Sequence, residues 1–287
     1  GQEGLVAYRA CLGYNFVQIQ EVDNMVLAFL LTTIAGLATG IGSMLAFFKK
    51  PSKRFLSVSL GFSAGVMIYV SMIEIFPKAL DALSQIYNTK TATLITIISF
   101  FAGMLLIGII DKLIPEEKNP HEASNCSSSN IKPQDNHTKL FRTGVFTALA
   151  VAIHNFPEGL ATFISAQQEP KVAIPIVFAI ALHNIPEGIA VSVPIYYATK
   201  SRKKAFLYSF ASGLSEPVGA LVGYLLLLPL MNDAVSGILF ASVAGIMVFI
   251  SLDELLPSAR EYGEHHLSIY GLVAGMAVMA MSLWMFI

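Results

Sequence analysis

The stretch His154-Asn-Phe-Pro-Glu-Gly-Leu-Ala161 returns 29 residues later as His183-Asn-Ile-Pro-Glu-Gly-Ile-Ala190, with six of the eight residues identical. Each copy lies near the middle of an apolar stretch, 142–166 and 172–198, that is long enough to cross a bilayer as a helix. Consecutive membrane helices joined by a short loop run antiparallel, so the copies meet at the same depth. The repeat therefore predicts a polar cluster inside a membrane domain.

The composition of the whole chain agrees with a membrane protein. Of 287 residues, 55% are hydrophobic and 13% are charged, and the mean hydropathy is +0.65. Soluble domains carry about 25% charged residues, so a soluble globular domain, a disordered chain and a nucleic-acid-binding protein are excluded. Cys11 and Cys126 lie outside the apolar stretches, so we predict neither a disulfide framework nor an intramembrane thiolate site.

Six further apolar stretches extend the pattern to eight. They occupy residues 24–48, 55–73, 91–110, 205–228, 234–252 and 267–287. All are too long for the strands of a membrane barrel, which span about 10 residues. The sequence thus predicts an all-α polytopic membrane protein with eight transmembrane helices over 25–287. Residues 1–24 fit no such stretch and are interpreted as a cloning remnant or a divergent extension.

The distribution of lysine and arginine predicts the orientation. Of the 18 basic residues, 14 fall in one alternating set of loops and 4 in the other. Because cytoplasmic loops carry the excess of Lys and Arg, we expect the set with 14 to be cytoplasmic and both termini to be extracytoplasmic, in the cell membrane. The loop 111–140, rich in Ser, Asn and Pro, is predicted to be mobile and cytoplasmic. Its His121 and His137 are interpreted as solvated histidines, with transient metal capture as the alternative.

Carboxylates lie where the membrane makes them costly. Glu158, Glu187 and Glu216 fall near the midpoints of their helices, and no Lys or Arg lies in the interior of any span. Three unpaired carboxylates at this depth would together cost about 8–10 kcal/mol. A helix–helix hydrogen bond would explain one such motif. Two copies at one depth, together with Glu216, instead indicate a bound cation that the protein itself does not supply.

The spacing within each copy suits metal ligation. His and Glu at i and i+4 share one helix face, and Asn at i+1 is three residues before the same Glu. One glutamate therefore serves two neighbouring ions. The predicted metal ligands are His154, Asn155, Glu158, His183, Asn184, Glu187 and Glu216. Nitrogen and oxygen ligands without cysteine favour Zn²⁺, and also suit Fe²⁺, Mn²⁺, Co²⁺ or Cd²⁺.

Further acidic residues mark the two ends of a route to this cluster. Glu74 and Asp81 lie near the predicted outer end of the second helix, and Asp253 and Glu254 lie near the inner end of the seventh. We interpret them as pathway residues, with carboxylates wetted at helix ends as the equal alternative. The loop containing Glu261, Glu264, His265 and His266 is a weaker candidate for metal hand-off.

The paired HNxPEG segments and the sequence SGLSEPVGA around Glu216 resemble the ZIP (Zrt/Irt-like) family of divalent metal transporters, most closely its bacterial ZupT-type branch. Residues 62–77 and 244–257 resemble that branch too. The resemblance implies eight helices and a two-metal centre between the fourth and fifth. One metal would take His154, Glu158, His183 and Glu187; the other would take Asn155, Glu158, Asn184, Glu187 and Glu216. It places Met67 at the outer approach and implies homodimers and an elevator-like movement.

These observations predict a carrier that imports Zn²⁺, and other divalent transition metals, into the cytoplasm. The metal is the transported substrate, and the partners are metal ions and lipid. A metal-selective channel is an alternative that the sequence does not separate from a carrier. A membrane-embedded metalloenzyme is disfavoured, because the chain lacks an HExxH motif and histidine boxes near the membrane surface.

Overall fold

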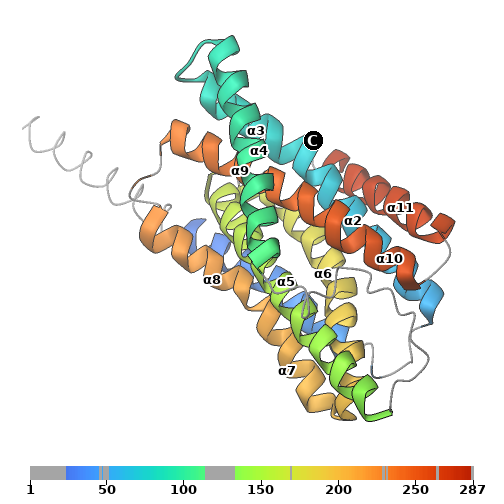
Figure 1. The fold of residues 1–287 in the computed structure, drawn as a ribbon. Helices are drawn as coiled ribbons and strands as arrows, with labels where there is room; N and C mark the ends of the chain where they lie inside the picture. Colours follow the sequence, from blue (N-terminus) through green and yellow to red (C-terminus); the bar gives the residue numbers. More distant parts are fainter. Residues whose placement is uncertain are drawn as a thin grey trace, which may run out of the picture.

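The computed structural model describes residues 24–44, 47, 52–113, 133–168, 170–227, 230, 232–262 and 265–285, and this part of the chain is helical apart from short connections. Eight consecutive helical segments form one bundle (Figure 1). Their bounds are the first helix Asn24–Met44; α2 (Lys53–Val70), η1 (Ser71–Ile75) and α3 (Phe76–Ser84); α4 (Thr89–Leu113); α5 (Pro133–Gln168); α6 (Pro170–Thr199); α7 (Arg202–Gly213), α8 (Ser215–Val222) and η3 (Gly223–Leu227); α9 (Asp233–Ile250), η5 (Ser251–Leu255) and α10 (Leu256–Tyr262); and α11 (His265–Trp284).

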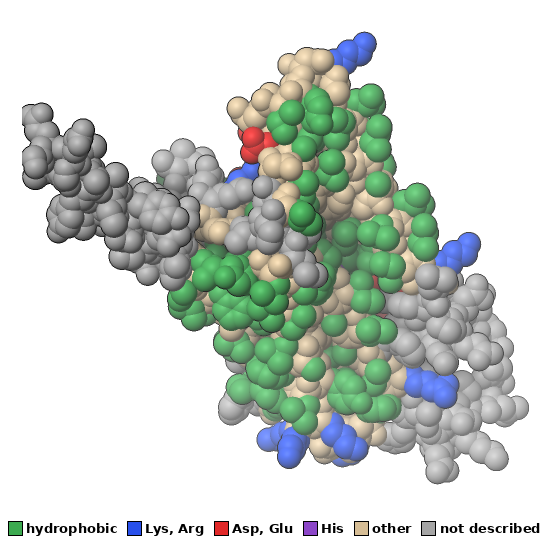
Figure 2. All heavy atoms as spheres, turned by 90° about the vertical axis from the view of Figure 1, so that its left-hand side faces the viewer, with side chains coloured by type: hydrophobic (Ala, Val, Ile, Leu, Met, Phe, Trp, Pro, Cys, Tyr) green, Lys and Arg blue, Asp and Glu red, His purple; other side chains and the backbone are tan. Residues whose placement is uncertain are grey.

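The all-α prediction with eight segments is confirmed. Within the described residues, six segments are long and apolar enough to cross a membrane. The other two segments are α5 and α7–α8, and both have basic residues near one end. α5 also contains the first HNxPEG copy, and α8 contains Glu216. Figure 2 shows hydrophobic side chains over most of one face, with Lys and Arg mainly at its margins. Such an apolar band is what a lipid-facing surface requires.

The second and seventh segments are longer than predicted. The sequence predicts that they end at 73 and 252, because a carboxylate follows each of these residues. The helices instead continue through the π-helical turns η1 and η5 into α3 and α10. A π turn widens the helix by one residue, which accommodates Pro77 and Pro257 just beyond. Both helices thus carry their carboxylates within the turn instead of ending there.

The predicted loop 111–140 is shorter than expected. α4 continues to Leu113 and α5 begins at Pro133, nine residues before the predicted start of the span. Proline suits the first turn of a helix because its missing N–H has no partner there. Residues 1–23 and 114–132, with Cys11, Cys126 and His121, lie outside the described residues, as does the side chain of His137. α5 and α6 run on through Pro157 and Pro186, so neither proline breaks its helix.

The structure reveals a second repeat. Residues 63–77 of α2–α3 read SAGVMIYVSMIEIFP, and residues 243–257 of α9–α10 read VAGIMVFISLDELLP. Each copy contains a π turn, and in each a serine hydroxyl at the start of that turn donates to a methionine carbonyl: Ser71 to Met67 at 2.6 Å and Ser251 to Met247 at 2.7 Å. These are the second and seventh crossings, so the copies run in opposite directions. The chain is therefore built from inverted halves around α5 and α6.

Candidate metal centre

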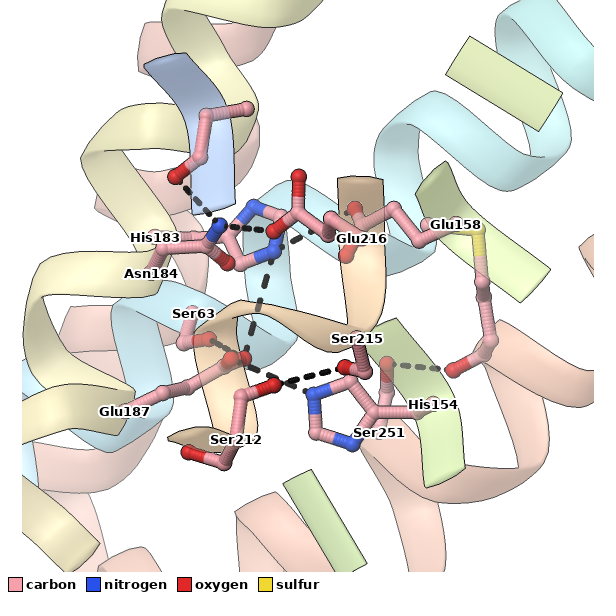
Figure 3. A network of polar contacts seen from close by, with 12 residues as sticks. Ser63, His154, Glu158, His183, Asn184, Glu187, Ser212, Ser215, Glu216 and Ser251 are labelled. Carbon is pink, nitrogen blue, oxygen red and sulfur yellow. Dashed lines mark hydrogen bonds and ion pairs between the residues drawn. The ribbon is translucent and has the colours of Figure 1, made fainter. Parts of the chain in front are cut away.

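Six of the seven predicted ligands converge in the middle of the bundle (Figure 3), and the seventh, Asn155, is buried next to His154 in α5. α5 supplies His154, Asn155 and Glu158, and α6 supplies the equivalent residues of the second copy. Glu216 lies in the first turn of α8. All seven side chains have at most 2% of their surface exposed. The three helices thus bring buried polar side chains together, and one of them is interrupted just before its acidic residue, at Leu214.

The two copies exchange partners across the α5–α6 interface. His154 Nε2 lies 3.2 Å from Glu187 Oε2, and His183 Nε2 lies 3.3 Å from Glu158 Oε1. The histidine of each helix thus meets the glutamate of the other. Within α6, His183 Nε2 is 3.9 Å from Glu187 Oε1. This reciprocal pairing follows from the antiparallel arrangement, because one motif turned end over end places its His beside the Glu of the other.

The asparagine of the second copy connects two further segments. Asn184 Nδ2 donates to the carbonyl oxygen of Ala35 in the first helix at 2.9 Å, and also donates to Glu216 Oε1. A single amide thereby joins α6, the first helix and α8. Buried amides and carboxylates are stable only when they are hydrogen-bonded. This contact accordingly fixes where the third carboxylate of the cluster lies.

The motif glycines let the neighbouring helices approach. A Cβ on Gly159 would lie 2.2 Å from the backbone oxygen of Glu216, and a Cβ on Gly188 would lie 1.8 Å from that of Thr39. Both distances are far below ordinary contact, so only glycine fits. Gly159 admits α8 and Gly188 admits the first helix. The two glycines therefore have the same role for two different helices, as the inverted repeat requires.

Many polar atoms of the cluster have no hydrogen-bond partner. They are Nδ1 of His154, both amide atoms of Asn155, both carboxylate oxygens of Glu158, both ring nitrogens of His183, Oδ1 of Asn184 and Oε2 of Glu216. Buried polar atoms are rarely left unpaired, because each costs about 1–3 kcal/mol. Nitrogen and oxygen atoms in this number form a donor set that fits a divalent cation.

The side chains lie in pairs. Among the described residues, no three His, Cys, Asp or Glu side chains surround a single point. Each histidine instead faces a glutamate at 3.2 or 3.3 Å. In this arrangement the histidines and glutamates are thus partners of one another.

The predicted pathway residues lie at different depths around the cluster. Met67 is fully buried in α2, Glu74 and Glu254 are half-buried in the two π turns, and Asp81 and Asp253 are exposed. Glu74 and Glu254 occupy equivalent positions of the inverted repeat.

The loop proposed for metal hand-off is only partly described. Glu261 and His266 are exposed, and the His266 ring stacks on Tyr270 with centroids 6.3 Å apart. Glu264 and the side chain of His265 lie outside the described residues. The metal hand-off role of this loop thus stays a prediction.

Two contacts were missed by the sequence reasoning. Ser63 of α2 donates its hydroxyl hydrogen to Glu187 Oε1 at 2.9 Å. On the other side, Met247 of α9 and Glu158 line one small cavity together with Thr162 and Ser165. The signal that was available is the repeat 63–77/243–257, in which Ser63 and Met247 are both included.

Comparison with known proteins explains this architecture. Residues 112–283 match the sequence model of a family described as ZIP Zinc transporter. The chain belongs to the ZIP zinc transporter family. A zinc transporter ZupT of Streptococcus mutans is 63% identical over 266 residues, covering 92% of this chain and 99% of the relative. A zinc transporter ZupT of Clostridium perfringens is 61% identical over 280 residues, covering 93% and 98%.

Membership of the ZIP family decides two predictions. The resemblance seen in the paired HNxPEG segments is confirmed, and the chain is a multi-pass membrane protein. ZIP proteins are transporters, so the metalloenzyme alternative is rejected.

Proposed function

We propose that this protein carries Zn²⁺ across the cell membrane into the cytoplasm through the buried His/Glu/Asn cluster. The observation that carries the proposal is the cluster itself: three glutamates, two histidines and two asparagines in the middle of the bundle, with nine polar atoms that lack hydrogen-bond partners. Relatives about 60% identical over more than 90% of the chain are named zinc transporters, which agrees with this donor set.

The arrangement favours two ions sharing the cluster. His154, Glu158, His183 and Glu187 supply nitrogen and oxygen ligands for one. Asn155, Asn184 and Glu216, with the same two glutamates, supply oxygen ligands for the other. The first set suits Zn²⁺, and Fe²⁺, Mn²⁺, Co²⁺ and Cd²⁺ remain predicted substrates because nitrogen and oxygen ligands do not separate them sharply.

The inverted repeat supports alternating access. Transporters with inverted repeats bind their substrate near the midplane and expose it to each side by moving one group of helices against the other. We propose that the helices carrying the cluster move in an elevator-like way, with Met67, Glu74 and Asp81 on the outer route and Asp253 and Glu254 on the inner one. The charge distribution of the loops supports extracytoplasmic termini, and homodimers remain a prediction.

Zinc uptake by proteoliposomes tests the proposal. Glu187→Ala removes the carboxylate that contacts His154 and Ser63, and we expect it to abolish saturable uptake. Glu261→Ala, which changes an exposed glutamate, is the control and should transport as the wild type does. Equal uptake by both variants, with Glu187→Ala monodisperse in detergent, would refute the site. Uptake that does not saturate with zinc would instead favour a channel.

A further inference from the structure

The glutamates of the two HNxPEG copies differ in one contact. Glu187 accepts a hydrogen bond from the Ser63 hydroxyl at 2.9 Å, whereas neither carboxylate oxygen of Glu158 has a hydrogen-bond partner. Both glutamates are buried, and both face the histidine of the opposite copy. The motifs themselves do not explain the difference, because they are identical at His, Asn, Pro, Glu and Gly.

The difference comes from the helices that surround the cluster. Ser63 is in α2, and Val243 is at the equivalent position of α9 in the inverted repeat. Valine has no hydrogen-bond donor in its side chain, so the equivalent position of α9 cannot supply the hydroxyl contact that Ser63 makes. Ser63 has no exposed surface, and its hydroxyl donates to Glu187. The contact is therefore a specific feature of one half of the protein.

We infer that Ser63 is a positioning residue for the metal-binding carboxylate of Glu187. Its hydroxyl holds Oε1 from the α2 side while His154 lies at Oε2 (Figure 3). The carboxylate is thereby fixed between two partners before a cation arrives. Partners of this kind orient metal ligands, and their loss typically costs about 10- to 100-fold in metal affinity. The inference rests on the proposed function, because it assigns Ser63 a role at the proposed centre.

The hydrogen bond between Ser63 and Glu187 also links the affinity for zinc to the position of α6 relative to α2. Ser63 and Glu187 belong to different helices, so sliding α6 along α2 separates them. A helix rises about 1.5 Å per residue, and a shift of one residue already takes a 2.9 Å contact beyond the range of a good hydrogen bond. The affinity for zinc is consequently highest in the arrangement seen here and falls when the two helices move apart.

Zinc binding to the purified protein, measured by competition with a fluorescent chelator, tests this role. Ser63→Ala should raise the Kd about tenfold, with a matching rise in KM for uptake and little change in Vmax. Ser63→Thr keeps the hydroxyl and should restore binding. Ser57→Ala is the matched control, because Ser57 is a buried serine of the same helix whose hydroxyl has no partner; its Kd should equal that of the wild type.

The outcomes separate this inference from the proposed function. If Glu187→Ala abolishes zinc binding but Ser63→Ala changes the Kd by less than about threefold, the role of Ser63 is refuted and the centre stands. If Glu187→Ala binds zinc normally, the centre itself fails. Should Ser63→Ala prove unstable, Ser63→Cys offers a weaker donor of similar size and should give an intermediate Kd; a Kd equal to the wild type would again refute the inference.

Discussion

Gly159→Ala tests how precisely the carboxylate of Glu216 must be positioned for zinc binding. The new Cβ would lie 2.2 Å from the backbone oxygen of Glu216, and 2.5 and 2.6 Å from its Cα and carbonyl carbon. Ordinary contact begins at 3.4 Å, so α8 must retreat by about 1.2 Å, the difference between 3.4 and 2.2. The neighbouring atoms are all backbone, so no side-chain rotation relieves the clash.

The retreat moves Glu216 with its helix. Functional sites tolerate displacements of about 0.5 Å, so we expect zinc affinity to fall by at least about tenfold, the lower end of the loss for a disturbed metal shell. Overpacking costs about 1–3 kcal/mol, which lowers the melting temperature without preventing folding. The assay is zinc binding to purified protein, followed by uptake in proteoliposomes.

Gly108→Ala is the control for Gly159→Ala. Its Cβ would meet only ring atoms of Phe249, the nearest at 3.2 Å, and a side chain gives way where a backbone does not. We expect wild-type binding and uptake from this variant. Wild-type zinc binding by Gly159→Ala would refute the argument, because it would mean that α8 can shift by this distance without affecting the site.

Two further predictions concern the ions themselves. Glu216→Gln preserves an acceptor for Asn184 but removes the charge, so zinc bound per chain should fall from two to one by titration with elemental analysis; two ions per chain would contradict a second ion at Glu216. Lowering the pH adds protons that compete with zinc for the histidines and glutamates. The KM for zinc should therefore rise as the medium is acidified, and a KM independent of pH would contradict direct binding to these side chains.

The sequence predicted the helices and the cluster because both depend on local patterns. Eight apolar stretches identify eight helices, and a polar motif repeated in two of them identifies the place where they meet. The ends of α2–α3 and α9–α10 were missed because the absence of charge was taken as the limit of a span. Glu74 and Asp253 remain helical within π turns, which a hydropathy criterion does not detect.

The contacts between distant segments required the structure. Ser63 and Glu187 are 124 residues apart in the sequence. A single serine in an apolar helix gives no sequence signal that predicts which residue it contacts. The same applies to Gly159 and Gly188. Small residues predict close helix packing, but which helix approaches each glycine depends on the order of all eight in the bundle.

The inverted architecture has a consequence for the number of sites. If the helices around the two antiparallel copies were also repeated, the copies would form identical half-sites facing opposite sides of the membrane. The surrounding helices differ, so the two half-sites are not identical. Glu216 lies against Gly159, whereas Thr39 holds the equivalent position against Gly188, so a single third carboxylate enters the cluster, where it accepts a hydrogen bond from Asn184 of the other copy.

The repeat 63–77/243–257 also differs between its two copies. Ser63 donates a hydrogen bond to Glu187, whereas the residue equivalent to Ser63 in α9 is Val243. Both differences between the halves, Glu216 in place of Thr39 and Ser63 in place of Val243, affect the same HNxPEG copy. In that copy Asn184 contacts Glu216, and Glu187 contacts Ser63. In the proposed centre Glu187 and Asn184 of this copy contact neighbouring helices, whereas Glu158 of the other copy meets His183 at 3.3 Å and the amide of Asn155 has no hydrogen-bond partner. Two near copies of one motif are therefore held by different neighbours, so the shared centre is asymmetric although its motifs are almost identical.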